Sequence, residues 1–410
     1  MYSEVYSVTL AGLDACIVKV ETDAGDGLPS FEMSGCLAAQ VTEARERVRV
    51  AVKNSGIILR PQKIMVNISP ADIRKAGNGF DLPVAAGILA ADGIIKTDML
   101  ESSVIIGELS LDGSVNAVRG IINCVAKAAQ MGFKRCIVPS CNICEGEHIE
   151  GIEVLGVDSL KQLIGYFNGE SELIDAKKSR EHDVIHMKNE TCPDFADITG
   201  QITAKRASLI AAAGHHNICY MGIPGTGKTM MAKRISTIML PLNESEKMEL
   251  TRIYSAAGKL EGRSIIEERP VRCPNYNTTK AVMLGGGVVL SPGEITLADK
   301  GILFLDEFNE FASAVIDSLR TPLEEHIIRI VRGSKEYIYP ADFMLVAAMN
   351  PCRCGYYPDR NRCSCTEHDI KRYMSRVSKP IWDRIDICTH MGMIDARNIL
   401  YESDVDKSSD

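Results

Sequence analysis

The stretch Gly222-Ile-Pro-Gly-Thr-Gly-Lys-Thr229 decides the fold of the second half of this chain. It fits the pattern G-x-x-x-x-G-K-[ST] at every fixed position, and it follows the short apolar run NICYMG and opens a run with helical spacing. Glycines let backbone N–H groups surround phosphate groups, and the start of a helix favours negative charge. The stretch therefore predicts a phosphate-binding loop between a buried strand and a helix, formed by Gly222, Ile223, Pro224, Gly225, Thr226, Gly227, Lys228 and Thr229.

The roles of two residues in this loop follow from the chemistry of a nucleotide triphosphate. We expect Lys228 to reach the β- and γ-phosphates and the Thr229 hydroxyl to bind Mg²⁺. A glycine-rich turn with an accidental lysine is the alternative, and the strand before the loop and the helix after it argue against it. The predicted cofactors are thus ATP and Mg²⁺.

A second part of the site is predicted in Ile302-Leu-Phe-Leu-Asp-Glu307, about 80 residues after the loop. Asp306 would hold Mg²⁺ through water, and Glu307 would orient and deprotonate the attacking water. Asn350 ends the apolar run FMLVAAMN and would hold the same water near the γ-phosphate. Apolar runs that end in polar residues are typical of central parallel strands, whose ends carry ligands. The alternative for Asp306 and Glu307 is that they end an ordinary buried strand. The alternative for Asn350 is an amide that is hydrogen-bonded at the end of its strand.

The composition agrees with a globular α/β protein. The chain has 410 residues, 45% hydrophobic and 24% charged, which suits two or three domains at about 150 residues each. The chain has no run of about 18 uncharged apolar residues, so we expect no membrane span. Its first residues do not resemble an export signal. We therefore expect a cytoplasmic protein, in which the 14 cysteines are reduced or bind metal. The net charge of −8 restricts any nucleic-acid contact to local basic patches.

Several further strings extend the pattern beyond the nucleotide motifs. They are DFADITGQ, RPVRCPN, GGGVVLSPGEITLADKGILFLDE, LRTPLEE, NPCRCGYY and DRIDI. With them, residues 194–400 resemble the magnesium-chelatase-like branch of the AAA+ ATPases, in particular the ComM/YifB family. Residues 1–165 resemble that family's N-terminal domain, which has a Lon-protease-like fold. The resemblance implies a hexameric, ATP-driven DNA helicase that drives branch migration in natural transformation.

The resemblance also implies roles for residues outside the nucleotide motifs. The segment with Asp197, Ile198, Gly200 and Gln201 would lie against the adenine, and Arg384 would be an arginine finger that acts in a neighbouring subunit. The stretch IIRIVRGSKEYIYP alternates like a hairpin with its turn at Gly333-Ser334. In related motors this hairpin points into the pore of the ring. Its candidate DNA contacts are Arg329, Arg332 and Lys335, although a solvated hairpin face would carry the same charges.

The chain departs from the family in two places. Asn275-Tyr276 stands where the family usually carries His-His, and the chain ends at Asp410, where the family's C-terminal helical lid would follow. The chain would thus be either truncated or a lidless variant. In the Lon-like part, Asp81 replaces the nucleophilic serine and Ile122 the lysine of the protease dyad. Because neither residue can perform that chemistry, we expect no proteolysis.

Cys352-x-Cys354 and Cys363-x-Cys365 lie within 14 residues, directly after Asn350. Four thiols in one short loop predict a tetrahedral Zn²⁺ site, and a reduced cysteine-rich loop is the alternative. Residues 351–380 also carry seven Lys or Arg against three Asp or Glu, a local net charge of +4. This basic stretch predicts DNA contacts, with Arg353 and Arg362 as the first candidates.

The predicted organisation is a Lon-like α+β domain over 1–167, a polar linker over 168–192, an AAA+ parallel-sheet core over 193–400 and a tail over 401–410. The predicted partners are DNA and further copies of the chain, in a hexamer, with no membrane contact. Two other functions fit the same motifs. One is the motor subunit of a metal chelatase, which would need partner subunits and a porphyrin substrate, and the other is a nucleotide-dependent scaffold without helicase activity.

Overall fold

The structure, a computed structural model, describes residues 1–176, 194–260, 262–287, 290–333 and 335–393. The chain forms two compact units. Unit 1 comprises Met1–His186 and Thr251–Ile266, and unit 2 comprises Met187–Leu250 and Glu267–Asp410. The predicted tail over 401–410 and most of the predicted linker lie outside the described residues. Within the described residues, no helix is long and apolar enough to cross a membrane.

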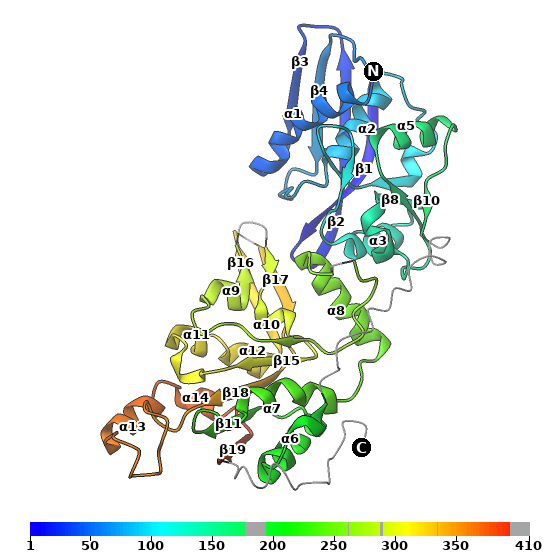
Figure 1. Ribbon diagram of the computed structural model, residues 1–410. Coiled ribbons are helices and arrows are strands. Elements are labelled where there is room, and N and C mark those ends of the chain that lie inside the picture. The colour runs from blue at the N-terminus through cyan, green and yellow to red at the C-terminus, as the bar shows by residue number, and fades with distance from the viewer. Residues whose placement is uncertain (177–193, 261, 288–289, 334, 394–410) are drawn as a thin grey trace. The chain divides into compact units, whose positions relative to one another are not determined.

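Unit 1 is built on a mixed sheet of eight strands in the order β10-β9-β8-β5-β1-β2-β4-β3 (Figure 1). The strands are β1 Tyr2–Ala11, β2 Asp14–Gly25, β3 Ser30–Ser34, β4 Lys63–Ser69, β5 Ser103–Ile105, β8 Arg135–Pro139, β9 Glu153–Val157 and β10 Ile174–Asp175. A small ladder joins β6 (Glu108–Leu109) to β7 (Val115–Asn116). The helices are α1 Ala39–Asn54, α2 Asp81–Ala91, α3 Ile121–Gln130, α4 Ile143–Gly146 and α5 Leu160–Asn168.

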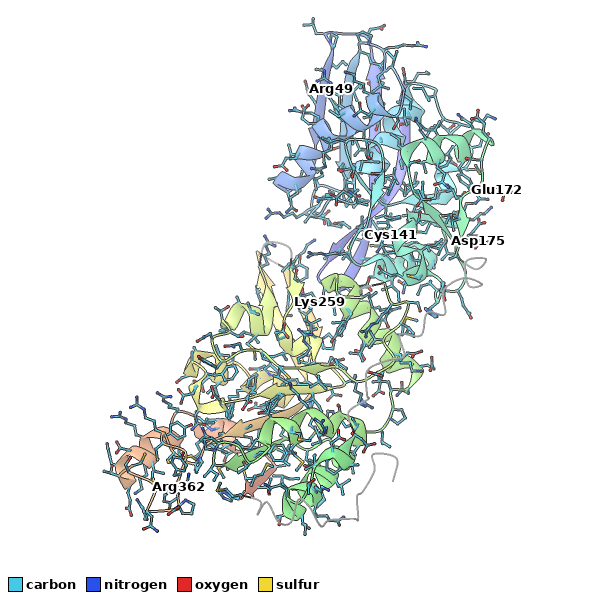
Figure 2. The ribbon with its side chains drawn as sticks, in the orientation of Figure 1. Arg49, Cys141, Glu172, Asp175, Lys259 and Arg362 are labelled. Carbon is cyan, nitrogen blue, oxygen red and sulfur yellow. The ribbon has the colours of Figure 1, made fainter. Side chains whose placement is uncertain are left out.

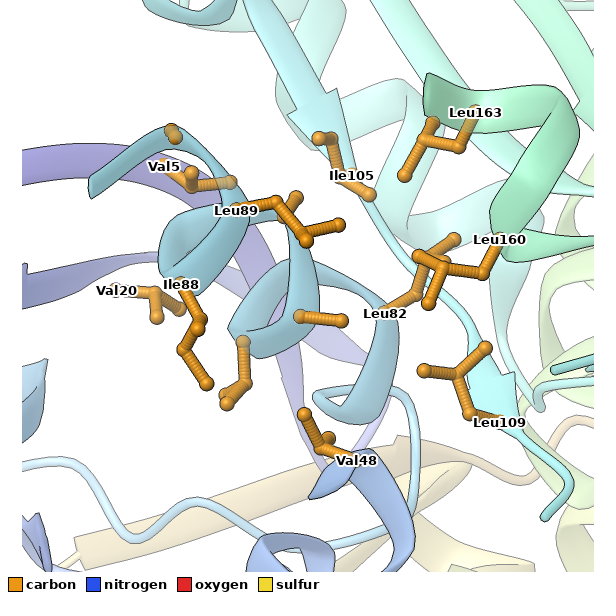
Figure 3. Close-up of a cluster of buried hydrophobic side chains, with 14 of the residues drawn as sticks. Val5, Val20, Val48, Leu82, Ile88, Leu89, Ile105, Leu109, Leu160 and Leu163 are labelled. Atoms are coloured by element: carbon orange, nitrogen blue, oxygen red, sulfur yellow. The ribbon is translucent and has the colours of Figure 1, made fainter. Parts of the chain in front are cut away.

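Helix α2 is the centre of this core, because every residue from Asp81 to Ala91 is buried. Leu82, Ile88 and Leu89 pack among apolar side chains from the sheet and from α1 and α5 (Figure 3). Asp81 itself accepts two hydrogen bonds from the guanidinium of Arg47, at 2.8 and 2.9 Å. Ile122 is fully buried in α3. Asp81 is therefore committed to an ion pair and Ile122 to the core, and neither offers a nucleophile or a base.

Two boundaries differ from those predicted from sequence. Residues 168–176 are not linker, because β10 pairs with β9 as the outermost strand and Ala176 is buried. Residues 251–266 belong to unit 1 instead of the core around the phosphate loop. The Gly120 N–H donates to the Ser255 carbonyl at 2.9 Å, and the Ser255 hydroxyl donates to the buried Glu145 carboxylate. Polar composition concealed the first boundary, and contacts distant in sequence set the second.

Unit 2 contains a parallel sheet of five strands in the order β12-β15-β18-β11-β19. The strands are β11 Ile218–Gly222, β12 Val271–Arg272, β15 Ile302–Leu305, β18 Met344–Met349 and β19 Ile387–Met391. The fold class predicted for this part, a mixed α/β architecture with a parallel sheet, is confirmed. The strand before the phosphate loop, β11, lies between β18 and β19, so the loop follows an inner strand of the sheet.

Helices and hairpins complete unit 2 (Figure 1). The helices are α6 Ile202–Gly214, α7 Lys228–Arg234, α8 Glu244–Ala257, α9 Lys280–Leu284, α10 Glu294–Leu297, α11 Ser313–Asp317, α12 Arg320–Glu325, α13 Glu367–Met374 and α14 Lys379–Trp382. α8 begins in unit 2 and ends in unit 1. The hairpins pair β13 (Gly285–Gly286) with β14 (Ser291–Pro292) and β16 (Ile327–Arg332) with β17 (Lys335–Pro340).

Candidate nucleotide site

The phosphate loop joins β11 to α7, as the sequence predicted. Gly225 and Gly227 have φ angles of 82° and 87°, a left-handed conformation that strains other residues. At Gly222 the reason for glycine is space, since a Cβ there would lie 2.4 Å from the Met391 carbonyl oxygen of β19. The sequence thus forms a tight turn directly before α7.

The Lys228 ammonium lies inside this turn. Its Nζ donates to the carbonyl oxygens of Gly222 and Ile223 at 2.7 and 3.0 Å, and to Asn350 Oδ1 at 3.2 Å. Asn350 follows β18, the strand next to β11, so the two side chains meet at the carboxyl end of the sheet. Burial lowers the pKa of Lys228. A phosphate group placed in the turn would supply the negative charge that these neutral carbonyl and amide oxygens lack.

Thr229 and Asp306 form the second contact across the sheet. The Thr229 hydroxyl donates to Asp306 Oδ2 at 2.7 Å, although the two residues are 77 positions apart. Asp306 follows β15 directly, and its Oδ1 accepts from the Glu307 N–H at 2.9 Å. A hydroxyl and a carboxylate oxygen in contact, with open space beside them, are the oxygen donors that Mg²⁺ prefers. The residues present therefore fit the predicted ion.

A cavity of about 320 Å³ adjoins these oxygens. Thr229, Asp306 and Glu307 line it, and so do Asn275 and Tyr276. Glu307 has a left-handed backbone with φ of 51°, a conformation that costs a non-glycine residue energy and occurs at functional turns. The departure from His-His at positions 275 and 276 thus falls beside the predicted Mg²⁺ and water ligands.

Two cavity residues were missed by the sequence analysis. Lys233 and Cys273 both line the cavity. Lys233 could have been found, because it lies four positions after Thr229 and so occupies the same face of the helix. Cys273 had no such signal, since only the folded chain brings the segment before Asn275 to the carboxyl end of β15.

The predicted adenine segment lies beside the phosphate loop. Gln201 Nε2 donates to the Thr226 carbonyl at 3.2 Å and to the Gly392 carbonyl at 2.8 Å. Asp197 pairs with Arg234 of α7 at 2.9 Å, and Ile198 is buried. Gly200 has a φ of 66°, which turns the chain toward α6. The segment is therefore fixed to both ends of the helix that carries Lys228.

Arg384 lies after α14, and its contacts are within its own chain. One terminal nitrogen pairs with the Glu324 carboxylate of α12, and the other donates to the Pro380 carbonyl at 3.1 Å. Glu324 also accepts from Arg320 at 3.2 Å. Within the described residues, no hydrogen bond or ion pair joins the Arg384 side chain to the phosphate loop. The structure therefore does not bring Arg384 to the nucleotide site of the same chain.

The predicted hairpin is present as β16 and β17, in which Arg332 pairs with Lys335, while Ser334 of its predicted turn lies outside the described residues. It separates the three predicted DNA contacts. Arg332 and Lys335 lie on one face at the tip, while Arg329 lies on the other face. Arg329 is paired with Glu325 at 3.3 Å and with Glu336 at 3.7 Å. Only the two residues at the tip therefore form one cationic group.

The four predicted zinc ligands come together between β18 and α13. The Sγ atoms of Cys352, Cys354, Cys363 and Cys365 all lie within 4.8 Å of one another. Cys352 is 3.3 Å from Cys354 and 3.8 Å from Cys363, and Cys354 is 3.6 Å from Cys363. Zn–S bonds of about 2.3 Å in a tetrahedron separate sulfur atoms by about 3.8 Å. A backbone hydrogen bond from Tyr356 lowers the pKa of Cys354 to about 6, which favours the thiolate form.

Two of the three arginines of this cysteine loop, residues 352–365, stack on its tyrosines. Arg362 lies 4.3 Å from the ring centre of Tyr356, and Arg360 lies 5.2 Å from that of Tyr357. Figure 2 marks Arg362, which is exposed, in this loop of unit 2. Arg353 is exposed as well. The loop thus presents cations and aromatic rings together, a combination that suits phosphates and bases.

Comparison with known proteins agrees with the site. A family model described as magnesium chelatase, subunit ChlI, matches residues 194–399, and a second ChlI model matches residues 20–142. The competence protein ComM of Haemophilus influenzae is 36% identical over 391 residues, which cover 95% of this chain and 76% of that protein. The uncharacterized protein YifB of Escherichia coli is 37% identical over 385 residues, 94% of this chain and 75% of its own. An archaeal Lon protease of Methanocaldococcus jannaschii is 26% identical over 156 residues, 36% of this chain and 24% of its own.

Proposed function

The chain belongs to the ComM/YifB family of magnesium-chelatase-like AAA+ proteins, and from this premise we propose that it hydrolyses ATP to move DNA. One observation carries the proposal. Lys228, Thr229, Asp306 and Asn350 meet at the carboxyl ends of neighbouring parallel strands, joined by contacts of 2.7 and 3.2 Å. This is the arrangement that triphosphate and Mg²⁺ require.

The proposed division of labour follows from the positions of the side chains. Lys228 neutralises the β- and γ-phosphates, while Thr229 and Asp306 hold Mg²⁺. When bound, Mg²⁺ would neutralise the negative charge that develops on the phosphates. Glu307 takes a proton from the attacking water, and Asn350 keeps that water in line with the γ-phosphate.

We further propose that several copies of the chain form a ring, as a hexamer. The reason is that Arg384 makes its contacts away from the nucleotide site of its own chain. In a ring it would reach the γ-phosphate of the neighbouring subunit, after leaving Glu324. The hairpin tip with Arg332 and Lys335 would contact DNA, and the cysteine loop with Arg353 and Arg362 would extend that surface.

Unit 1 would be a Lon-like domain that serves as a partner surface without proteolysis, a proposal supported by the Asp81–Arg47 ion pair.

For the cysteine loop we propose Zn²⁺ as the resident ion. Four sulfur donors within 4.8 Å of one another favour Zn²⁺ over Mg²⁺ or Ca²⁺, which prefer oxygen donors. Two of the cysteines, Cys352 and Cys363, are buried, so the ion would be enclosed by protein as structural zinc sites are.

Branch migration on a synthetic four-way DNA junction tests the proposed function. We expect strand exchange with ATP and Mg²⁺ and none with ADP. A metal-chelatase motor is the second candidate, favoured by the description of the matching family model. It would hydrolyse ATP without moving the junction and would respond to a porphyrin and partner subunits instead. ATP turnover with neither response would leave a nucleotide-dependent scaffold.

A further inference from the structure

We infer that the cysteine loop controls the affinity of the nucleotide site, because the ion that closes the loop also fixes three elements that hold the nucleotide. The inference rests on the metal site proposed above. Ion binding in the cysteine loop and nucleotide binding at the phosphate loop, both in unit 2, would then be thermodynamically coupled. The three elements are the phosphate loop, the turn after Glu307, and Asn350.

The first link is a direct contact between the two loops. Gly355, between the cysteine pairs, has a φ of 86°, and a Cβ on it would lie 2.8 and 3.1 Å from Cδ and Cγ of Pro224. Pro224 is the third residue of the phosphate loop. The Gly355 N–H donates to the Cys352 carbonyl at 2.9 Å, so the turn that carries Cys352 and Cys354 also places Gly355 against Pro224.

The second link joins the last cysteine to the acidic turn. α13 begins directly after Cys365, with Thr366 as its N-cap. From its end, the Tyr373 carbonyl accepts a hydrogen bond from Asn309 Nδ2 at 3.0 Å. Asn309 is fully buried and lies two positions after Glu307. The position of Cys365 therefore influences the turn that holds the proposed general base.

Arg376 strengthens this second link. Its Nη1 donates to the Asn309 carbonyl at 3.2 Å and to the Glu310 carboxylate at 2.9 Å. The third link is the chain itself, since Asn350, which accepts from Lys228, lies two positions before Cys352. All three elements around the proposed nucleotide are thus attached to the segment that the four cysteines close.

Metal binding at such a site contributes folding free energy, so its loss frees the loop and the contacts that the loop makes. We expect nucleotide affinity to fall when the ion is removed. Coupling between two sites is reciprocal, and coupling factors are typically about 5- to 150-fold. The nucleotide must therefore tighten Zn²⁺ binding by the same factor by which Zn²⁺ tightens nucleotide binding.

Two titrations on the full chain measure this coupling. A fluorescent ADP analogue with Mg²⁺ is titrated into zinc-loaded protein and into protein stripped with a zinc-selective chelator. Zinc affinity is then measured against a chromophoric chelator with and without ADP. We expect equal shifts of at least about 5-fold in both. Equal nucleotide affinity in both forms, with zinc bound in one, overturns the coupling but leaves the metal site intact. Absence of zinc from folded, reduced protein overturns both.

Variants that keep all four cysteines test the contact itself, even if the stripped protein unfolds. Gly355→Ala should retain zinc but weaken ADP binding, because its Cβ pushes Pro224 away. Adding Pro224→Ala should recover part of the loss, since the clash is removed. Gly132→Ala in unit 1 is the matched control, with a φ of 82° and no atom within 4 Å of its Cβ. Normal ADP affinity in zinc-loaded Gly355→Ala, or no recovery in the double variant, contradicts the proposed link.

Discussion

Lys228 shows at the scale of one residue how the site is prepared for a phosphate. Its ammonium already lies in the turn, held by three oxygens. We predict that Lys228→Ala abolishes detectable ADP or ATP binding, because the positive charge at the phosphates is lost. Isothermal titration calorimetry with Mg²⁺ present measures this. Lys161→Ala is the control, since Lys161 is an exposed lysine on helix α5 of unit 1 and its loss should leave nucleotide affinity unchanged. Wild-type affinity in Lys228→Ala would refute the assignment of the loop.

The positions of the candidate nucleotide residues could be predicted because each belongs to a short contiguous motif at the end of an apolar strand. Lys228, Thr229, Asp306 and Asn350 lie where those strands end in the sheet. The partner of Arg384 could not be predicted in this way. Glu324 lies 60 positions earlier on a short helix, and no local pattern relates it to the arginine.

At the scale of elements, the cysteine loop is the part whose stability depends on an ion. We predict about one zinc per chain by elemental analysis, lost in a Cys363→Ser/Cys365→Ser variant. The melting temperature should fall by about 4 to 8 °C if about 2 kcal/mol of stability is lost. Cys141→Ser/Cys144→Ser, a pair of cysteines in unit 1, is the control and should keep its zinc. A zinc-free wild type that melts at the same temperature as the variant would refute the site.

The hairpin of β16 and β17 gives a prediction that separates its two faces. Arg332→Ala should weaken DNA binding and lower the slope of log affinity against log salt by about one. Arg329→Ala is the matched control on the opposite face, where Glu325 and Glu336 already offset the charge. Fluorescence anisotropy with labelled DNA at several salt concentrations checks both variants. Equal effects of the two substitutions would show that the faces are not distinct.

Helix α2 shows what pattern analysis cannot predict. After Asp81 its residues are apolar on every side because the whole helix is buried, so the sequence lacks the alternation of an amphipathic helix. By contrast, α6 ends at Gly214, a residue type that commonly marks the end of a helix in a sequence. Short elements such as β10 and β12, with two residues each, were also missed, since they depend on neighbouring strands more than on their own sequence.

At the scale of the assembled molecule, Arg384 is expected to act in a neighbouring subunit. We predict that Arg384→Ala binds ATP but hydrolyses it slowly, because charge on the transferring phosphoryl group is no longer neutralised. Mixing it with Lys228→Ala should restore part of the turnover, since intact sites form where a Lys228→Ala subunit donates Arg384 to an Arg384→Ala neighbour. The ATPase rate as a function of mixing ratio measures this. A rate that stays at the level of the separate variants at every ratio would exclude a shared site.

The central claim is that the chain is an ATPase whose chemistry depends on the turn after β15. Steady-state ATP turnover in Glu307→Gln, measured at saturating nucleotide confirmed by a binding titration, tests it most directly. The account predicts unchanged ATP binding with turnover lowered about 10²-fold or more, the effect of losing a general base. Turnover equal to that of the wild type at the same occupancy would contradict it.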